Sequence, residues 1–162
     1  MLENRKDAEF MAAAIALSQR GRGRTGGNPN VGCIIVKDGK IVGRGWTQPS
    51  GRPHAEAMAL EEASISSHQA DIYVTLEPCA HESKRGPACV DSLIEAKPAR
   101  VVIASLDPDV RTHRKSIDRL GDAGISVSVG LMEQEARRVM AGFFTRMEKS
   151  RPYITLKLAM SL

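Results

Sequence analysis

Apolar residues recur with a helical period at the start of the chain. Residues 5–19 place Phe10, Ala14 and Leu17 on one side of a helix, and Asn4 is positioned as its N-cap. The pattern therefore predicts an amphipathic helix as the first element.

Two apolar runs follow, separated by a short polar pair. VGCIIVK and KIVGRGW occupy residues 31–37 and 40–46, with Asp38-Gly39 between them. Because an Asp-Gly pair suits the positive φ angles of a type I′ turn, this segment predicts a β-hairpin.

Helical and extended patterns then alternate to the end of the sequence. Further helices are predicted over 54–64, 87–96, 114–123 and 133–150, and further strands over 71–76, 100–105, 125–130 and 153–162. A hairpin followed by alternating helices and strands predicts an α/β fold. We expect a mixed sheet of about five strands with helices on both faces.

Length and composition fit one globular domain, with 162 residues, 42% hydrophobic and 26% charged. The longest apolar runs have the length of strands, so no membrane span is expected. No secretory signal is evident at the N-terminus. Three cysteines, without the spacing of a disulfide scaffold, favour a reducing, cytoplasmic location.

The net charge of +4 suits a small anionic substrate or RNA equally well. Aromatic residues make up only 4% of the chain, fewer than base-stacking platforms for single-stranded nucleic acid usually need. We therefore expect a small-molecule substrate, and neither a membrane nor a nucleic acid as partner.

The most informative residues are one histidine and two cysteines near predicted element boundaries. His54 opens a helix, Cys79 follows a strand, and Cys89 lies ten residues further on. One imidazole and two thiolates are good zinc ligands, and three protein ligands leave a fourth position open for water, as in catalytic zinc sites. We therefore expect one catalytic Zn²⁺ on these three residues.

Glu56 lies close to this predicted site. Residues two apart are about 200° apart around a helix, so His54 and Glu56 can face one site only from the first turn. Pro53 and Pro87 are placed to start the two helices there. The positive helix ends favour the thiolate form of cysteine, and Glu56 is positioned to move protons.

Each of these residues also has an ordinary structural explanation. An isolated His-x-Glu usually lies on a solvated helix face, and an isolated cysteine is more often a small buried hydrophobe. The latter is our interpretation of Cys33, within VGCIIV. The joint pattern at predicted boundaries favours the zinc site.

The order H-A-E, P-C and a later Cys resembles the zinc-dependent cytidine-deaminase superfamily. In its nucleobase and tRNA deaminases the second half is P-C-x-x-C, but Glu82 stands here at the second Cys position. The longer loop CAHESKRGPAC resembles the deaminase domain of the bifunctional riboflavin-biosynthesis deaminase/reductase. Other stretches agree with that family: NPNVGCIIVKDGKIVGRG, GRPHAEAMAL, YVTLEPCAH, RVVIASLDPD and YITLKLAMSL.

The resemblance implies a three-layer cytidine-deaminase-like fold and roles for particular residues. It implies zinc on the three residues already named, Glu56 as general acid and base, and substrate binding by Asn28, His81 and Lys84. It also implies a deaminase domain over 1–150 and, over 151–162, a junction similar to the start of a C-terminal reductase. A homo-oligomer is expected.

The implied activity is hydrolytic deamination of 2,5-diamino-6-(5-phosphoribosylamino)pyrimidin-4(3H)-one, a pyrimidine ribotide, in riboflavin biosynthesis, with release of ammonia. One alternative is deamination of guanine, cytosine or a tRNA adenosine. A second is a non-catalytic zinc-binding module, which needs a fourth protein ligand; His81 is the nearest spare candidate.

The chain departs from the family pattern at three places. The second cysteine lies ten positions after the first instead of nine, with the extra residue expected around Arg85-Gly86. Gly26-Gly27 replaces a His-Pro pair before Asn28, and Thr47 replaces a histidine after the second strand. Of the other histidines, His68 is expected at the surface and His113 in a loop without a partner.

Overall fold

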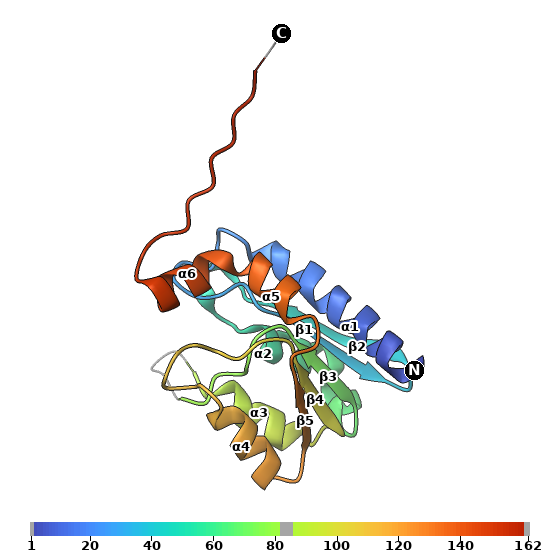
Figure 1. The fold of residues 1–162 in the computed structure, drawn as a ribbon. Helices are drawn as coiled ribbons and strands as arrows, with labels where there is room; N and C mark the ends of the chain where they lie inside the picture. The colour runs from blue at the N-terminus through green and yellow to red at the C-terminus, as the bar shows by residue number, and fades with distance from the viewer. Residues whose placement is uncertain (1, 82–85, 161–162) are drawn as a thin grey trace.

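Five strands form one mixed sheet in the computed structural model, which describes residues 2–81 and 86–160 (Figure 1). The strand order is β2-β1-β3-β4-β5. β1 is antiparallel to β2 and β3, and β3, β4 and β5 run parallel to one another. The strand bounds are β1 Gly32–Lys37, β2 Lys40–Trp46, β3 Asp71–Val74, β4 Arg100–Ile103 and β5 Ser126–Val129. The predicted mixed sheet is confirmed.

The turn between β1 and β2 has the predicted form. Asp38 and Gly39 have φ angles of 51° and 72°, as a type I′ turn requires. The hairpin is confirmed.

Helices cover both faces of the sheet. α1, α5 and α6 lie on one face, and α2, α3 and α4 lie on the other (Figure 1). Their bounds are α1 Leu2–Ser18, α2 Ala55–Ala63, α3 Cys89–Ala96, α4 Lys115–Asp122, α5 Glu133–Val139 and α6 Ala141–Lys149. Within the described ranges, no helix has the length and apolar character needed to cross a membrane.

Two predicted helix features are wrong. α1 begins at Leu2, so Asn4 lies inside the helix and is not its N-cap. The helix predicted over 133–150 is two helices, because Met140 leaves helical geometry at φ −103° and ψ 18°. Met140 is only 1% exposed, and its packing overrides the local helical pattern.

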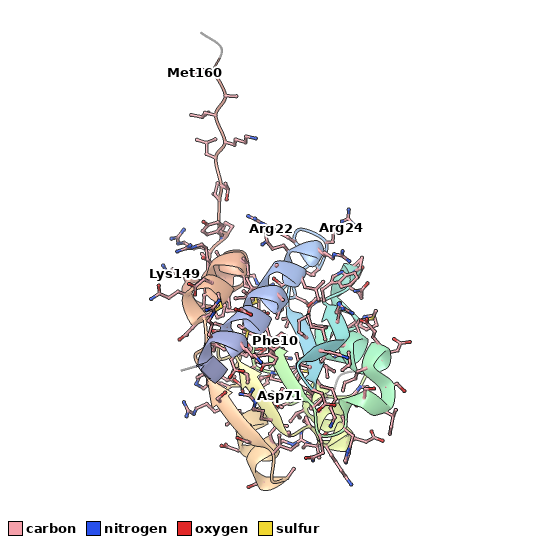
Figure 2. All side chains as sticks on the ribbon, turned by 90° about the vertical axis from the view of Figure 1, so that its right-hand side faces the viewer. Phe10, Arg22, Arg24, Asp71, Lys149 and Met160 are labelled. Atoms are coloured by element: carbon pink, nitrogen blue, oxygen red, sulfur yellow. The ribbon has the colours of Figure 1, made fainter. Side chains whose placement is uncertain are left out.

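The strand predicted over 153–162 is absent from its described part, residues 153–160. This segment extends away from the folded body, with Met160 at its far tip (Figure 2). Ile154 and Leu158 are 82% and 80% exposed. A strand needs a neighbour to pair with, and no described residue of this chain pairs with the segment. The domain division at residue 150 stays a prediction.

Helix α2 lies against β2 at a distance that only glycine permits. A Cβ atom at Gly45 would lie 1.9 Å from the carbonyl oxygen of Ala55, and one at Gly43 would lie 2.3 Å from that of Ala59. Both neighbours are backbone atoms, so they cannot move without moving the helix. This contact fixes the N-terminus of α2 over the sheet.

A polar network ties α1 to the middle of the sheet. Arg100 donates two hydrogen bonds of 2.8 Å to the Asp7 carboxylate and one of 2.8 Å to Asp71. The Tyr73 hydroxyl donates to Asp7 at 2.6 Å. The hydrogen bond from Arg100 lowers the pKa of Asp7 below its ordinary value.

We expect Gly45→Ala to destabilise the fold by about 3 kcal/mol or more, because the new methyl group overlaps backbone atoms of α2. Gly121→Ala in α4 is the matched control, since a Cβ there meets nothing within 4 Å. Chemical denaturation measures both variants. Equal stability of Gly45→Ala and the wild type would show that the two elements are not in close contact.

We expect Asp7→Asn to cost about 2 kcal/mol of unfolding free energy at pH 7, because charged hydrogen bonds are lost. A carboxyl group whose pKa is lowered by folding stabilises the protein above its unfolded pKa of about 3.9, and the effect is lost as the pH falls through the folded pKa. The difference from the wild type therefore shrinks toward about pH 3. Denaturant unfolding at both pH values tests this, with Asp38→Asn as an exposed control; a difference independent of pH contradicts it.

Candidate metal centre and cavity

The three predicted zinc ligands come from three different elements and meet at one end of the sheet. His54 is the N-cap residue of α2, Cys79 lies in the segment after β3, and Cys89 is the first residue of α3. Pro53 and Pro87 were predicted to occupy the first helical positions. This is wrong, because each helix begins two residues after its proline. The helix N-termini still carry the ligands to one place.

The side chains of these residues lie within contact distance. His54 Nδ1 is 3.2 Å from the Sγ atom of Cys89 and 3.6 Å from that of Cys79. The donor atoms all lie within 4.8 Å of one another, and the three residues form the group in the described part of the chain that could hold a metal ion. The structure thus brings the predicted ligands together.

The protonation of the two thiols suits metal binding. A hydrogen bond from the Cys89 side chain, together with that from His54, lowers the pKa of Cys79 to about 4. The backbone N–H of Cys89 also donates to Cys79 Sγ at 3.2 Å. The same interaction with Cys79, and burial, raise the pKa of Cys89. Cys79 is therefore a thiolate at neutral pH, and Cys89 releases its proton when a metal binds.

One imidazole nitrogen and two sulfurs in a buried group are the donors that zinc prefers. No fourth protein donor belongs to the group among the described residues. His81, the spare candidate of the module hypothesis, has its Nδ1 atom 3.2 Å from the Thr112 hydroxyl. The donor set fits zinc with an open position.

Glu56 lies in the first turn of α2, two residues after His54, as predicted. Only 3% of it is exposed, and burial raises the pKa of its carboxyl group. It lines the same cavity as His54 and Cys79 without belonging to the metal-ligand group. A buried carboxyl group at this place is suited to proton transfer.

A cavity of about 360 Å³ opens beside these groups. Asn28 and His81, two of the predicted substrate-binding residues, line it. Lys84, the third, lies outside the described residues, as does Arg85 of the Arg85-Gly86 pair around which the extra residue of the cysteine loop is expected. The binding roles of all three stay predictions.

The two family positions that lack histidine have different surroundings. Thr47 is buried, and its hydroxyl accepts a hydrogen bond of 2.9 Å from the Val31 N–H, so it holds the start of β1. Gly26 is exposed, and a Cβ atom there would meet nothing within 4 Å. Thr47 therefore has a structural contact, whereas Gly26 leaves space.

The other singled-out residues are only partly as predicted. Cys33 is fully buried in β1 and His68 is exposed, as predicted. His113 has a partner after all, because its Nδ1 atom lies 2.8 Å from the Asp107 carbonyl oxygen.

Sequence reasoning missed two acidic residues that line the cavity, Glu77 and Asp107. The buried Glu77 accepts hydrogen bonds from the Ser116 hydroxyl at 2.9 Å and the Asp107 N–H at 3.2 Å. These bonds tie the segment that carries Cys79 to the loop after β4. Burial raises the pKa of Asp107 to about 6. The acidic DPD sequence directly after a buried strand was the available signal.

It also missed the wall that α6 contributes. Phe143, Arg146 and Met147 line the cavity from this helix, more than fifty residues after Cys89 in the sequence. No local motif marks them, because only the packing of α6 against the sheet places them there.

Comparison with known proteins gives a consistent result. Residues 4–105 match the model of the cytidine and deoxycytidylate deaminase zinc-binding region. The riboflavin biosynthesis protein RibD of Escherichia coli is 51% identical over 157 residues, which are 97% of this chain and 42% of that protein.

Solved structures agree. RibD of Acinetobacter baumannii superposes with a TM-score of 0.89 and 42% identity, covering 93% of this chain and 42% of that one. A diaminohydroxyphosphoribosylaminopyrimidine deaminase/5-amino-6-(5-phosphoribosylamino)uracil reductase of Thermotoga maritima has a TM-score of 0.88 and 37% identity, covering 93% and 44%. The chain thus spans less than half the length of these relatives.

We expect Cys89→Ala to lose zinc, because two protein donors remain in place of three. Cys33→Ala is the matched control, since Cys33 is buried in β1 outside the ligand group. Metal analysis of the purified proteins should give about one zinc per chain for the wild type and the control. Stoichiometric zinc in Cys89→Ala would show that another residue is the third ligand.

Proposed function

Because the chain belongs to the cytidine and deoxycytidylate deaminase zinc-binding family, we propose that it is a zinc-dependent deaminase of riboflavin biosynthesis. Its substrate is 2,5-diamino-6-(5-phosphoribosylamino)pyrimidin-4(3H)-one. Water replaces the amino group at C2 of the pyrimidine, a carbonyl forms, and ammonia leaves.

One observation carries the proposal. The buried Glu56 carboxyl group lines a cavity of about 360 Å³ together with His54 and Cys79, and Cys89 completes the group of three donors behind that wall. A structural zinc site needs neither an open coordination position nor a buried acid beside it. A hydrolytic reaction needs both.

Zinc, when held by these three residues, would supply Lewis acidity, the chemistry that makes hydroxide available from water near neutral pH. The Glu56 carboxylate accepts the proton that the attacking water loses. It donates that proton to the ring nitrogen, then takes the second proton of the added water from the new C2 hydroxyl group and donates it to the leaving amine, so that the carbonyl forms as ammonia departs. Burial supports this role, because the raised pKa of Glu56 lets it hold the proton between the two transfers.

The names of the relatives support the choice of substrate. The Thermotoga maritima protein is named as a deaminase of a phosphoribosylaminopyrimidine, and the Escherichia coli protein as a riboflavin biosynthesis protein. Both match nearly the whole of this chain. The relative named for tRNA:A34 deamination is only 23% identical, so it supports the fold alone.

Asn28 and His81 are proposed to bind the substrate. Asn28 is held in place, because its Nδ2 donates to the Thr25 carbonyl oxygen at 3.3 Å, which leaves its side-chain oxygen to accept from a ring or exocyclic N–H. His81 is oriented by Thr112. A reductase domain after residue 150 is proposed from the sequence resemblance and from the greater length of the relatives. Assembly into a homo-oligomer is proposed from the sequence resemblance.

We expect Glu56→Gln to retain zinc and to lose turnover by about 10³-fold, because the amide cannot accept and return the proton. Glu61→Gln is the control, since Glu61 lies on the exposed side of the same helix. Ammonia release from the ribotide and zinc content are measured on the same preparations. Turnover within about twofold of the wild type would rule out this role for Glu56.

A further inference from the structure

Arg146 of α6 reaches across to the glycine-rich segment before β1. One of its guanidinium nitrogens donates a hydrogen bond to the Gly27 carbonyl oxygen. Arg146 lines the cavity beside the metal centre, and it also lines a second cavity of about 650 Å³. It therefore stands at the junction of the two cavities.

Gly27 provides the space in which this guanidinium lies. A Cβ atom at Gly27 would be 2.8 Å from the other terminal nitrogen of Arg146. Gly27 does not have a positive φ, so its backbone would accept alanine. The absence of a side chain at Gly27 therefore leaves the space that the Arg146 guanidinium occupies.

The charge at the junction itself is positive, because Arg146 is the charged residue among the described residues that line both cavities. Four acidic residues line other parts of the first cavity: Glu56, Glu77, Asp107 and Asp109. Among the described residues, three arginines line the first cavity. Arg111 is neutralised by Asp109, with bonds to both carboxylate oxygens. No described carboxylate lies within ion-pair distance of Arg146, and the described lining of the second cavity contains Arg22 and Arg138 but no acidic residue.

The other arginine of the first cavity is tied to the metal end. Arg52 lies two residues before His54, and its guanidinium donates to the Pro87 carbonyl oxygen at 3.4 Å. The pyrimidine must lie at that end, because its amino group reacts there. The charged end of a ribotide therefore points away from Arg52, toward another part of the cavity.

We propose that Arg146 binds the phosphate of the substrate at the junction of the two cavities, in the space that Gly27 leaves. This inference rests on the proposed function for the identity of the substrate. A guanidinium presents paired N–H donors that match phosphate oxygens. Arg22 and Arg138 extend the positive potential around it and strengthen binding at low ionic strength.

The variants Arg146→Gln and Gly27→Ala test the proposal in different ways. Arg146→Gln removes the charge, whereas Gly27→Ala keeps it and displaces the guanidinium. Arg5→Gln is the control, because Arg5 is an exposed residue of α1 paired with Glu9. We measure kcat/KM for the ribotide and for the same compound without its phosphate, and the Kd of ribose 5-phosphate.

The ratio of ribotide to riboside kcat/KM is expected to fall about tenfold in Arg146→Gln, because a charged hydrogen bond is lost. It falls at least about threefold in Gly27→Ala, and adding Gly27→Ala to Arg146→Gln changes it by less than about twofold. The Kd of ribose 5-phosphate is expected to rise more in Arg146→Gln than in Gly27→Ala. A merely structural role would instead lower turnover of both compounds equally.

Two results separate this inference from the proposed function. An active wild type whose ratio and Kd are unchanged in Arg146→Gln overturns the phosphate site and leaves the deaminase assignment standing. A wild type that does not deaminate the ribotide, yet loses ribose 5-phosphate affinity on Arg146→Gln, overturns the assignment and supports the phosphate site. If Arg146→Gln leaves the Kd of ribose 5-phosphate unchanged, the proposed phosphate site is wrong in either case.

Discussion

The close contact between α2 and β2 is the constraint on which the metal centre depends. Gly43 and Gly45 lack side chains, so the helix lies directly on the strand. The N-terminus of α2 is thereby fixed at the end of the sheet where the metal ligands meet. His54 and Glu56 are carried there as a consequence. The Glu77 hydrogen bonds fix the second part of the site, because they tie the segment with Cys79 to the loop after β4. Metal ligands and proton carrier are thus positioned by the packing and hydrogen bonds of the surrounding elements.

Two neighbouring buried groups have pKa values shifted in opposite directions. Hydrogen bonds received by Cys79 outweigh the effect of burial and lower its pKa to about 4, whereas for Glu56 burial is the larger effect and raises its pKa. A thiolate ready to bind metal and a carboxyl group able to hold a proton therefore line the same cavity. This is the pairing that metal-assisted hydrolysis requires, since one group holds the ion and the other moves protons.

Local sequence patterns predicted the hairpin, the mixed sheet and the metal ligands, because each has a short-range signature. Asp38-Gly39 sets its own turn, and His54, Cys79 and Cys89 follow ligand chemistry at element boundaries. The break at Met140, the lack of a strand over the described residues 153–160 and the cavity wall from α6 have no such signature. They depend on which residues pack together across the sheet or on whether a partner strand is present. Arg146 is the clearest case, because its position depends on the absence of a side chain at Gly27.

The cavity therefore joins a metal end, built from conventional donors, to a positively charged end that no motif marks. The positive charge of Arg146 beside that metal end supports the proposed ring with an anionic extension over a bare nucleobase. The most direct test is the rate of ammonia release by the zinc-loaded protein from the pyrimidine ribotide, compared with cytidine, guanine and a tRNA stem-loop containing adenosine. We predict that kcat/KM for the ribotide exceeds the others by at least about 100-fold. A preference for any of the other three, or no release from the ribotide at full zinc occupancy, would contradict the account.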